Sequence, residues 1–277
     1  MKIKLLLAAL LATSITLIVF FWSNNEAKIL YHTENDFGPI WVFEKNDIRC
    51  MSFIKPPAPI TQSCMSLKNP KTAALFHYSQ IFLGSLFLKE NPEKILMIGL
   101  GGATVAKALN ILVPNARLDI VEINPAIPPI VADYFEFRET HKNHIFVADG
   151  FEFVKNSPAN IYDIILLDAF TQDYIPPSFL TDEFMQNVKK VMTKDGVVVI
   201  NTFANSKFQN LESELFKNNF GKYYNLSTDQ TRVMMASNGN LAKLPEIIHQ
   251  SNLWRYRFVE VGVDQTAVLS LFQDALR

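Results

Sequence analysis

The sequence has few of the residues that bind metals, and it has no excess of positive charge. Its 277 residues include five histidines and two cysteines, and the formal net charge is -1. No long block of one charge is present, which excludes the electrostatic footprint of a nucleic-acid-binding protein. Only His141 and His144 have a spacing like that of metal ligands, and they flank an expected loop. The sequence therefore predicts no metal site and no nucleic-acid partner.

Internal repeats and low-complexity tracts are also missing, which excludes a repeat architecture. What the sequence does have is apolar material: 49% of its residues are hydrophobic. This length and composition suit one sizeable domain with appendages.

The first residues form a distinct apolar segment. After the basic start Met-Lys-Ile-Lys, no charged side chain occurs as far as Trp22. A run close to ~20 apolar residues crosses a bilayer as a helix, whereas a secretory signal has a shorter apolar region and a small-residue cleavage site. Residues 23–28 offer no such site. We therefore expect an uncleaved single-pass anchor over residues 1–23.

The charges that flank this segment predict its orientation in the cytoplasmic (inner) membrane. Lys2 and Lys4 precede it, whereas Lys28 beyond it is offset by Glu26 and Glu34. Because positive residues stay inside, an outward-facing, periplasmic domain is favoured over a cytoplasmic one.

Residues 24–70 are expected to form a small β-domain that contains a hairpin. Residues 55–59, Lys-Pro-Pro-Ala-Pro, cannot continue a ladder and mark its turn. Cys50 and Cys64 lie symmetrically about Pro57, so an antiparallel hairpin places them opposite each other, with Cα atoms ~4.5–5.5 Å apart. This spacing permits a disulfide bond. The alternative is a pair of buried thiols, which a reducing cytoplasm would maintain.

From residue 93 the pattern changes to apolar strands alternating with amphipathic helices. Such a pattern predicts a parallel sheet covered on both faces, that is, a doubly wound α/β fold over residues 71–240. Residues 241–277 are expected to be a helical extension. The expected strands are 94–99, 117–122, 144–148, 161–167 and 196–200, with helices at 71–89, 104–112, 126–134 and 178–192, and a closing antiparallel pair at 222–226 and 231–236.

In such a sheet, ligands bind outside the carboxyl ends of the strands. The first strand ends in a turn with Gly99, Gly101 and Gly102, which lets the backbone approach a ligand and exposes N–H groups at a helix N-terminus. The dinucleotide pattern would have a third glycine at Thr104. The second strand ends in Glu122, which is placed to accept hydrogen bonds from ribose hydroxyls.

The next two strands also end in acidic residues. Asp149, followed by Gly150, is either the cap of the next helix or a hydrogen-bond partner for an adenine amino group. Asp168 ends a very hydrophobic strand, where burial would raise its pKa and prepare it to accept a proton. Asp173 and Tyr174 follow closely and are candidates for orienting an acceptor.

These motifs resemble those of the spermidine synthase family over roughly residues 30–236. The resemblance implies a Rossmann-like fold of the class I S-adenosylmethionine-dependent methyltransferase type, preceded by a small β-domain. It assigns Glu122 to the ribose, the run Asp149-Gly-Phe-Glu-Phe153 to the adenine and Asp168 to catalysis. The runs Asp168-Ala-Phe and Ile175-Pro-Pro look most like the membrane-linked branch of the family.

Three positions depart from the family pattern. Gly102 stands where the family has an aspartate, Thr171 stands where it has a second one, and Phe37-Gly38 stands for its Tyr-Gln pair. These changes remove much of the carboxylate cage that grips a polyamine.

The resemblance implies transfer of an aminopropyl group from decarboxylated S-adenosylmethionine to a small amine acceptor, without a metal. Methyl transfer from S-adenosylmethionine is the alternative that Gly102 favours, and a binding protein that has lost the reaction is another. An NAD-linked oxidoreductase is disfavoured by Thr104 and Asp149. A homodimer is compatible with the sequence.

Overall fold

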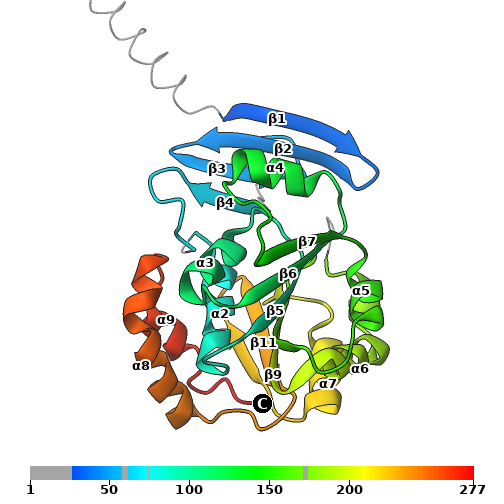
Figure 1. Cartoon of the computed structure of the whole chain (residues 1–277), viewed down its shortest axis with the longest axis vertical. Coiled ribbons are helices and arrows are strands. Elements are labelled where there is room, and N and C mark those ends of the chain that lie inside the picture. Colours follow the sequence, from blue (N-terminus) through cyan, green and yellow to red (C-terminus); the bar gives the residue numbers. More distant parts are fainter. Residues whose placement is uncertain (1–26, 58–61, 74, 171–173) are drawn as a thin grey trace, which may run out of the picture. The chain divides into compact units, whose positions relative to one another are not determined.

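The computed structural model describes residues 27–57, 62–73, 75–170 and 174–277 (Figure 1). The chain divides into two compact units, Met1–Lys68 and Asn69–Arg277. The membrane segment predicted over residues 1–23 lies outside the described residues. Within the described ranges, no helix is long and apolar enough to cross a membrane. The domain boundaries expected from the sequence stay predictions.

The first unit contains a four-stranded antiparallel sheet whose strands lie side by side in chain order. The turn from the second strand to the third consists of Asn46 and Asp47, with φ angles of 52° and 60°. Two-residue hairpin turns require this left-handed conformation, which Asn and Asp tolerate. The predicted hairpin consists of the last two strands. The strands are β1 (Lys28–Asn35), β2 (Gly38–Lys45), β3 (Ile48–Ser52) and β4 (Ser63–Ser66).

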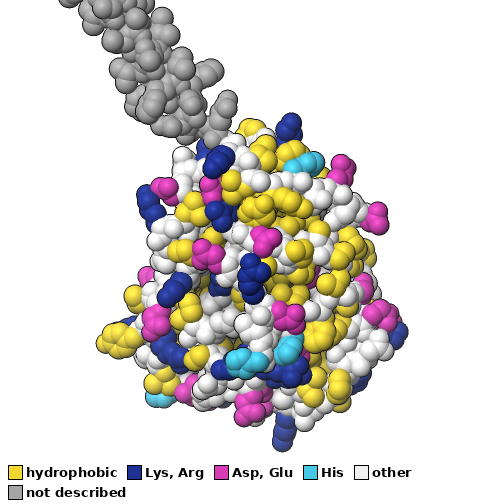
Figure 2. Space-filling model, turned by 45° about the horizontal axis from the view of Figure 1, so that its top comes forward, with side chains coloured by type: hydrophobic (Ala, Val, Ile, Leu, Met, Phe, Trp, Pro, Cys, Tyr) yellow, Lys and Arg dark blue, Asp and Glu magenta, His cyan; other side chains and the backbone are white. Residues whose placement is uncertain are grey.

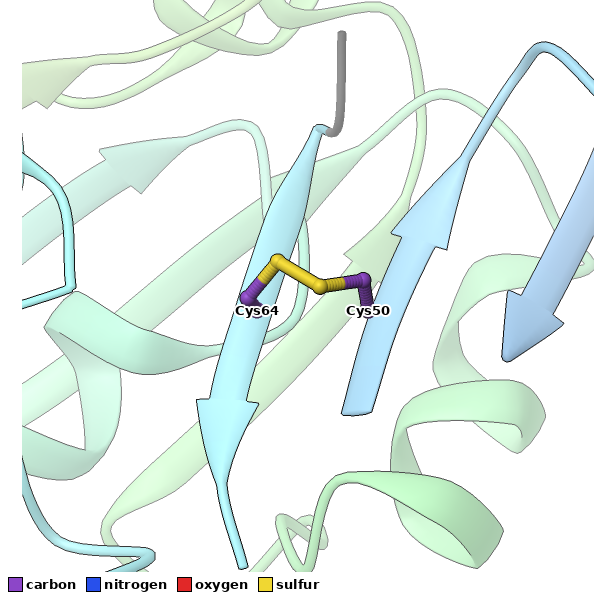
Figure 3. The surroundings of a disulfide bond; sticks show 2 residues. All are labelled: Cys50 and Cys64. Carbon is purple, nitrogen blue, oxygen red and sulfur yellow. A yellow bond between two sulfur atoms is a disulfide. The ribbon is translucent and has the colours of Figure 1, made fainter. Parts of the chain in front are cut away.

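A disulfide bond joins β3 to β4 (Figure 3). Cys50 and Cys64 are directly opposite each other in the register of these two strands. Their Cα atoms are 4.0 Å apart, somewhat closer than the hairpin geometry predicted. Both residues are only 7% exposed. The predicted pairing of the two cysteines is confirmed.

The second unit is built on a seven-stranded sheet with the order β10-β11-β9-β8-β5-β6-β7. Five neighbouring strands, β9, β8, β5, β6 and β7, run parallel to one another. In contrast, β11 runs antiparallel to its neighbours β9 and β10. This topology confirms the predicted Rossmann-like α/β fold and its closing antiparallel pair. The strands are β5 (Lys94–Ile98), β6 (Arg117–Glu122), β7 (Asn143–Val147), β8 (Tyr162–Leu167), β9 (Met192–Phe203), β10 (Tyr224–Ser227) and β11 (Thr231–Ser237).

Helices cover both faces of this sheet, which is why its central strands are apolar on both sides (Figure 1). All six residues of β8 are buried, for example. One face carries α2 (His77–Leu83), α3 (Thr104–Leu112), α8 (Leu244–Glu260) and α9 (Gln265–Ser270), and the other carries α5 (Gly150–Asn156), α6 (Asp182–Val191) and α7 (Gln209–Phe220). A further helix, α4 (Ile127–Tyr134), has its two prolines in the first turn, where a missing N–H leaves no helical bond unmade.

Two predicted helices are shorter than expected. The helix expected at 71–89 consists of α2 and a 3-10 helix at Gly84–Phe87. The helix expected at 178–192 is preceded by a 3-10 helix at Pro177–Phe179, and α6 begins only after Thr181. The Thr181 hydroxyl accepts a hydrogen bond from the Phe184 N–H at 3.2 Å, so it is the N-cap of α6.

The strand order locates the site. The chain places β6 and β7 on one side of β5, then returns to place β8 and β9 on the other. Ligands of doubly wound proteins bind at the carboxyl ends of the strands where the order reverses, here β5 and β8. Gly99 and Asp168 are the first residues after these two strands.

Candidate active site

The turn after β5 requires glycine. Gly99 has a φ of +95°, and a Cβ atom at this position would lie 2.2 Å from the main-chain oxygen of Asp168. Gly101 also has a positive φ, 51°. Gly102 is buried and has no side chain to offer a ligand. The turn therefore brings main-chain groups, rather than side chains, to the start of α3.

Glu122, at the end of β6, is bonded to the glycine turn. Its carboxylate accepts hydrogen bonds from the N–H groups of Leu100, at 3.0 Å, and Asn124, at 2.9 Å. The residue is 9% exposed. Burial raises the pKa of Glu122, and the N–H groups of Asn124, Leu100 and Ile123 oppose this effect. The carboxylate is thus held in a fixed position, while its predicted ribose contact stays a prediction.

Asp149 follows β7 and is exposed. Its carboxylate accepts a hydrogen bond from the Glu152 N–H at 3.0 Å, which makes it the N-cap of α5. Gly150 is buried, and a Cβ atom there would lie 2.5 Å from the side chain of Ile98 on β5. The capping role weighed for Asp149 is therefore present, and close packing accounts for the glycine.

Two exposed apolar side chains accompany these acids at the carboxyl ends of β6 and β7. Ile123 directly follows Glu122 and is 48% exposed, and Val147, two residues before Asp149, is 53% exposed. Exposed aliphatic side chains at this edge offer a surface for a flat apolar group.

Asp168 is held by side chains from two distant elements. The Asn201 side chain, on β9, donates a hydrogen bond to it at 2.9 Å, and the Tyr78 hydroxyl, on α2, donates another. Burial raises the pKa of Asp168 to about 6, although both hydrogen bonds act in the opposite direction. Burial, and then the neighbouring Asp168, raise the pKa of Tyr78 well above its usual value. Tyr78 therefore stays protonated and donates, and Asp168 is a carboxylate poised to take up a proton near neutral pH.

The other two predicted catalytic residues have different outcomes. Asp173 lies outside the described residues. The Tyr174 hydroxyl donates a hydrogen bond to Glu212, on α7. Burial, and then this bond, raise the pKa of Tyr174 to about 12. Its hydroxyl is thus engaged with Glu212 and does not exchange protons near neutral pH.

The rings beside Asp168 form what we call the aromatic wall, which consists of Phe170, Tyr174 and Phe203. Phe170 stacks on Phe203 with ring centroids 5.1 Å apart, and Tyr174 lies 5.5 Å from Phe203. Phe203 is 45% exposed. The wall is therefore packed within itself and open on one side.

Sequence reasoning missed Tyr78 and Asn201. Asn201 directly follows the apolar strand expected at 196–200, as Asp168 directly follows the one expected at 161–167, so the sequence held a signal for it. Tyr78 lies on a helix far earlier in the chain, and no local pattern marks it. The buried pair of Glu212 and Arg232 also carried no signal.

The described residues offer no cluster of metal ligands, and the face drawn in Figure 2 shows no surface of a single charge. Among the residues that the structure describes, no group of three or more His, Cys, Asp or Glu side chains could hold a metal ion. On the face drawn in Figure 2, acidic and basic side chains are interspersed among apolar ones rather than separated by sign.

The fold and these strand ends define a class: an α/β nucleotide-binding protein of the methyltransferase fold type, with a glycine turn, a fixed acid on the next strand and a buried acid across the switch in strand order. Residues 76–238, more than half of the chain, match the family described as spermine/spermidine synthase domain. The chain belongs to this family, which is a family of transferases.

The chain is also similar to individual proteins. The polyamine aminopropyltransferase of Vibrio vulnificus is 35% identical over 227 residues, which cover 81% of this chain and 75% of that protein. The eEF1A lysine and N-terminal methyltransferase of Mus musculus is 28% identical over 158 residues, covering 53% of this chain and 22% of that protein. The solved structure of a spermidine synthase in complex with the transition-state analogue AdoDATO has a TM-score of 0.69 at 19% identity, covering 88% of this chain and 85% of that one.

Proposed function

We propose that the protein transfers an aminopropyl group from decarboxylated S-adenosylmethionine to an amine. The observation that carries this proposal is Asp168, a carboxylate with a pKa of about 6 held between Tyr78 and Asn201 at the switch in strand order. The polyamine aminopropyltransferase from Vibrio vulnificus, to which the chain is similar, supports the nature of the transferred group.

The reaction needs little beyond alignment and one proton acceptor. The amine nitrogen forms a bond to the carbon next to the sulfonium, and the carbon–sulfur bond breaks with its electron pair remaining on sulfur. The leaving group is a neutral thioether, 5′-methylthioadenosine. Asp168 takes the proton that the amine loses, and alignment supplies most of the remaining acceleration. Tyr78 and Asn201 fix the orientation of the carboxylate.

The nucleotide would lie along the carboxyl ends of β5, β6 and β7. Gly99 and Gly101 let the backbone approach it, and Glu122 would accept hydrogen bonds from the ribose hydroxyls. The adenine would lie between the exposed Ile123 and Val147, with its amino group toward Asp149. The fixed position of the Glu122 carboxylate and the exposure of the two aliphatic side chains support this arrangement.

The test is an incubation of the protein with decarboxylated S-adenosylmethionine and a mixture of amines, followed by mass spectrometry. We expect 5′-methylthioadenosine and an amine heavier by one aminopropyl group, and neither with Asp168→Asn. If wild-type protein binds no adenosyl nucleotide in calorimetry at millimolar concentration, the proposal is wrong.

Methyl transfer from S-adenosylmethionine is the second candidate. Gly102 favours it, because no carboxylate is present there to hold an aminopropyl ammonium group, and the similar lysine and N-terminal methyltransferase supports it. The same incubation with S-adenosylmethionine distinguishes the two. A methylated product together with S-adenosylhomocysteine would replace the first proposal with this one.

We also propose that the N-terminal segment anchors the chain in the cytoplasmic membrane with the folded part outward. The disulfide between Cys50 and Cys64 supports this, since disulfides persist in oxidising compartments and are rare in the cytosol. Alkylation of protein isolated from native membranes, followed by intact mass, should find no free thiol before reduction and two after it. Two free thiols without reduction would contradict the outward orientation.

A further inference from the structure

An open groove lies beside α5, on the face of the sheet that α5, α6 and α7 cover. Its volume is about 590 Å³, and side chains from β6, β7 and α5 take part in its lining. Side chains alternate along a strand, so Phe146, which lines the groove, and Val147, beside which the adenine is proposed to lie, point to opposite faces. The groove and the apolar surface proposed for the adenine are therefore separated by the sheet.

The two ends of the groove carry opposite charges. Lys94 and Arg117, the first residues of β5 and β6, lie at one end, and Asp149, which follows β7, lies at the other. Leu118 is opposite Asn143 in the register of β6 and β7, so the ends are roughly 20 Å apart along the strand direction. Exposed charges this far apart are largely screened from each other at physiological ionic strength.

The carboxylate at the basic end is already balanced. The Asp119 side chain is 3% exposed, and it forms ion pairs with both Lys94 and Arg117 at 3.0 Å. The Tyr162 hydroxyl donates a further hydrogen bond to it at 3.0 Å. Two cations therefore face one carboxylate, and this group of side chains keeps a net positive charge.

Arg117 has hydrogen bonds left to donate. Its Nε atom bonds to Asp119, whereas the two terminal nitrogens of its guanidinium group have no hydrogen-bond partner among the residues that the structure describes. Its side chain is 50% exposed. Lys94, in contrast, lies over the Tyr162 ring, with its Nζ atom 4.7 Å from the ring centroid. A guanidinium group held at one edge presents its remaining donors in the geometry that a carboxylate accepts.

Aromatic side chains line the part of the groove beside α5. The rings of Phe146 and Phe153 have centroids 5.0 Å apart, and both side chains are only partly buried. Ile161, also partly buried, lines the same groove. These side chains offer apolar surface that a bound ligand would remove from water.

We propose that this groove is a second binding site, which takes a monocarboxylate with an aromatic body. The carboxylate lies on the terminal nitrogens of Arg117, and the body lies against Phe146 and Phe153. A second anionic group beyond the rings would be disfavoured, because Asp149 and Glu152 line that part of the groove. This inference goes beyond the proposed transfer and does not depend on it.

The test uses 4-phenylbutanoate, in which a short flexible chain joins a carboxylate to a phenyl ring. It is titrated by calorimetry into the full chain, beside 4-phenylbutanamide, which lacks the charge, and butanoate, which lacks the ring. We expect 4-phenylbutanoate to bind at least about tenfold more tightly than either, since it alone uses both parts of the groove. Equal affinities for the acid and its amide would overturn the inference.

Substitutions locate the binding. Arg117→Gln should weaken 4-phenylbutanoate about tenfold and remove its advantage over the amide. Asn156→Trp, at an exposed position of α5 that lines the groove, should fill the groove and abolish binding while Arg117 stays in place. Arg138→Gln is the matched control, because Arg138 also pairs with an aspartate, Asp133, and its side chain is 69% exposed. The control should leave the affinity within about twofold, and thermal unfolding checks that each variant is folded.

A second titration, with 5′-methylthioadenosine present at millimolar concentration, separates the groove from the proposed nucleotide subsite. We expect the affinity for 4-phenylbutanoate to change by less than about twofold. Competition between the two ligands would place the carboxylate in the nucleotide subsite and overturn the inference. Loss of binding in Arg138→Gln, or unchanged binding in both Arg117→Gln and Asn156→Trp, would overturn it as well.

Discussion

Glu122 and Asp168 end the two strands that flank β5, yet the chain holds them by different means. The Glu122 carboxylate is bonded to main-chain N–H groups of Leu100 and Asn124, which are 22 and two residues away in the sequence. The Asp168 carboxylate is bonded to side chains of Tyr78 and Asn201, the latter 33 residues away and on another strand. Burial raises the pKa of both acids.

This difference suits the two roles proposed for these acids. A main-chain N–H group remains when its residue is substituted, so the Glu122 carboxylate keeps its partners, which suits the proposed nucleotide subsite. The Asp168 side depends on individual side chains, whose donors orient the carboxylate toward one direction, as proton transfer requires. Substitutions at four positions test this division, from the largest expected effect to the smallest.

The largest effect should come from Asp168→Asn, which keeps the shape and removes the proton acceptor. We expect turnover to fall by about 10²–10⁴-fold, while nucleotide affinity changes less than about threefold. In the wild type, the pKa of about 6 predicts that kcat/KM falls on acidification below that pH, as the carboxylate takes up a proton. Steady-state kinetics from pH 5 to pH 9 checks both statements, and unchanged turnover in the variant would show that Asp168 is structural.

The same shift has a consequence for stability. The folded pKa of Asp168 lies above its unfolded value, so the folded state binds the proton more tightly, and this contribution is lost as the pH rises through about 6. The asparagine in Asp168→Asn does not titrate, so the variant does not lose this contribution. Its free energy of unfolding, relative to that of the wild type, should therefore be higher at pH 8 than at pH 4. Urea unfolding at both pH values measures the difference.

Gly99→Ala should disturb both the Asp168 region and the proposed nucleotide subsite. The added Cβ would meet the Asp168 main-chain oxygen at 2.2 Å, at a φ that disfavours any side chain. We expect the free energy of unfolding to fall by about 3 kcal/mol or more, and nucleotide binding to be lost. The matched control is Gly221→Ala, where φ is +74° and no atom lies within 4 Å of the added Cβ. Only the cost of the backbone conformation, about 1–3 kcal/mol, should then appear, and equal losses in the two variants would remove the close approach from the explanation.

Glu122→Ala should act on the nucleotide side alone. It leaves the N–H groups of Leu100 and Asn124 without their acceptor, which should cost about 1–3 kcal/mol of stability and a similar amount of nucleotide affinity. Glu122→Gln keeps an acceptor oxygen and should recover part of both losses. Calorimetric titration with nucleotide and urea unfolding give the two quantities. If Glu122→Ala altered the pH–rate profile as strongly as Asp168→Asn does, the two acids would not have separate roles.

The smallest effect concerns the turn itself. Ala103 precedes α3 with a φ of 58°, a left-handed conformation that costs a residue with a Cβ atom more than it costs glycine. Ala103→Gly should raise the free energy of unfolding by about 0.5–1 kcal/mol. Ala106→Gly, inside the same helix, should lower it by about 1 kcal/mol or more. A loss of stability in both variants would show that the Ala103 methyl group contributes more by packing than its conformation costs.

The two sides of the site also differ in how far the sequence predicts them. Strand ends carry the glycine turn, Glu122 and Asp149, and one rule about parallel sheets brings these ends together. The partners of Asp168 are different, because the contact of Tyr78 depends on how α2 packs over the sheet. The engagement of Tyr174 depends on Glu212 and Arg232, which meet only in the folded chain. The predicted start of the helix at residue 178 was wrong, although the sequence contains a signal for the correct start, since Thr181 is a typical N-cap residue.

The disulfide between Cys50 and Cys64 acts on the unfolded state of the chain. It closes a loop between residues separated by 14 positions, and in the chain-entropy view a loop of this size removes about 3 kcal/mol of conformational freedom from the unfolded chain. A unit as small as Met1–Lys68 buries a smaller fraction of its surface on folding than a larger one, so this reduction is a substantial share of what keeps it folded. Reduction should therefore make the first unit the part most exposed to proteases, and limited proteolysis with and without reductant would show cleavage there first.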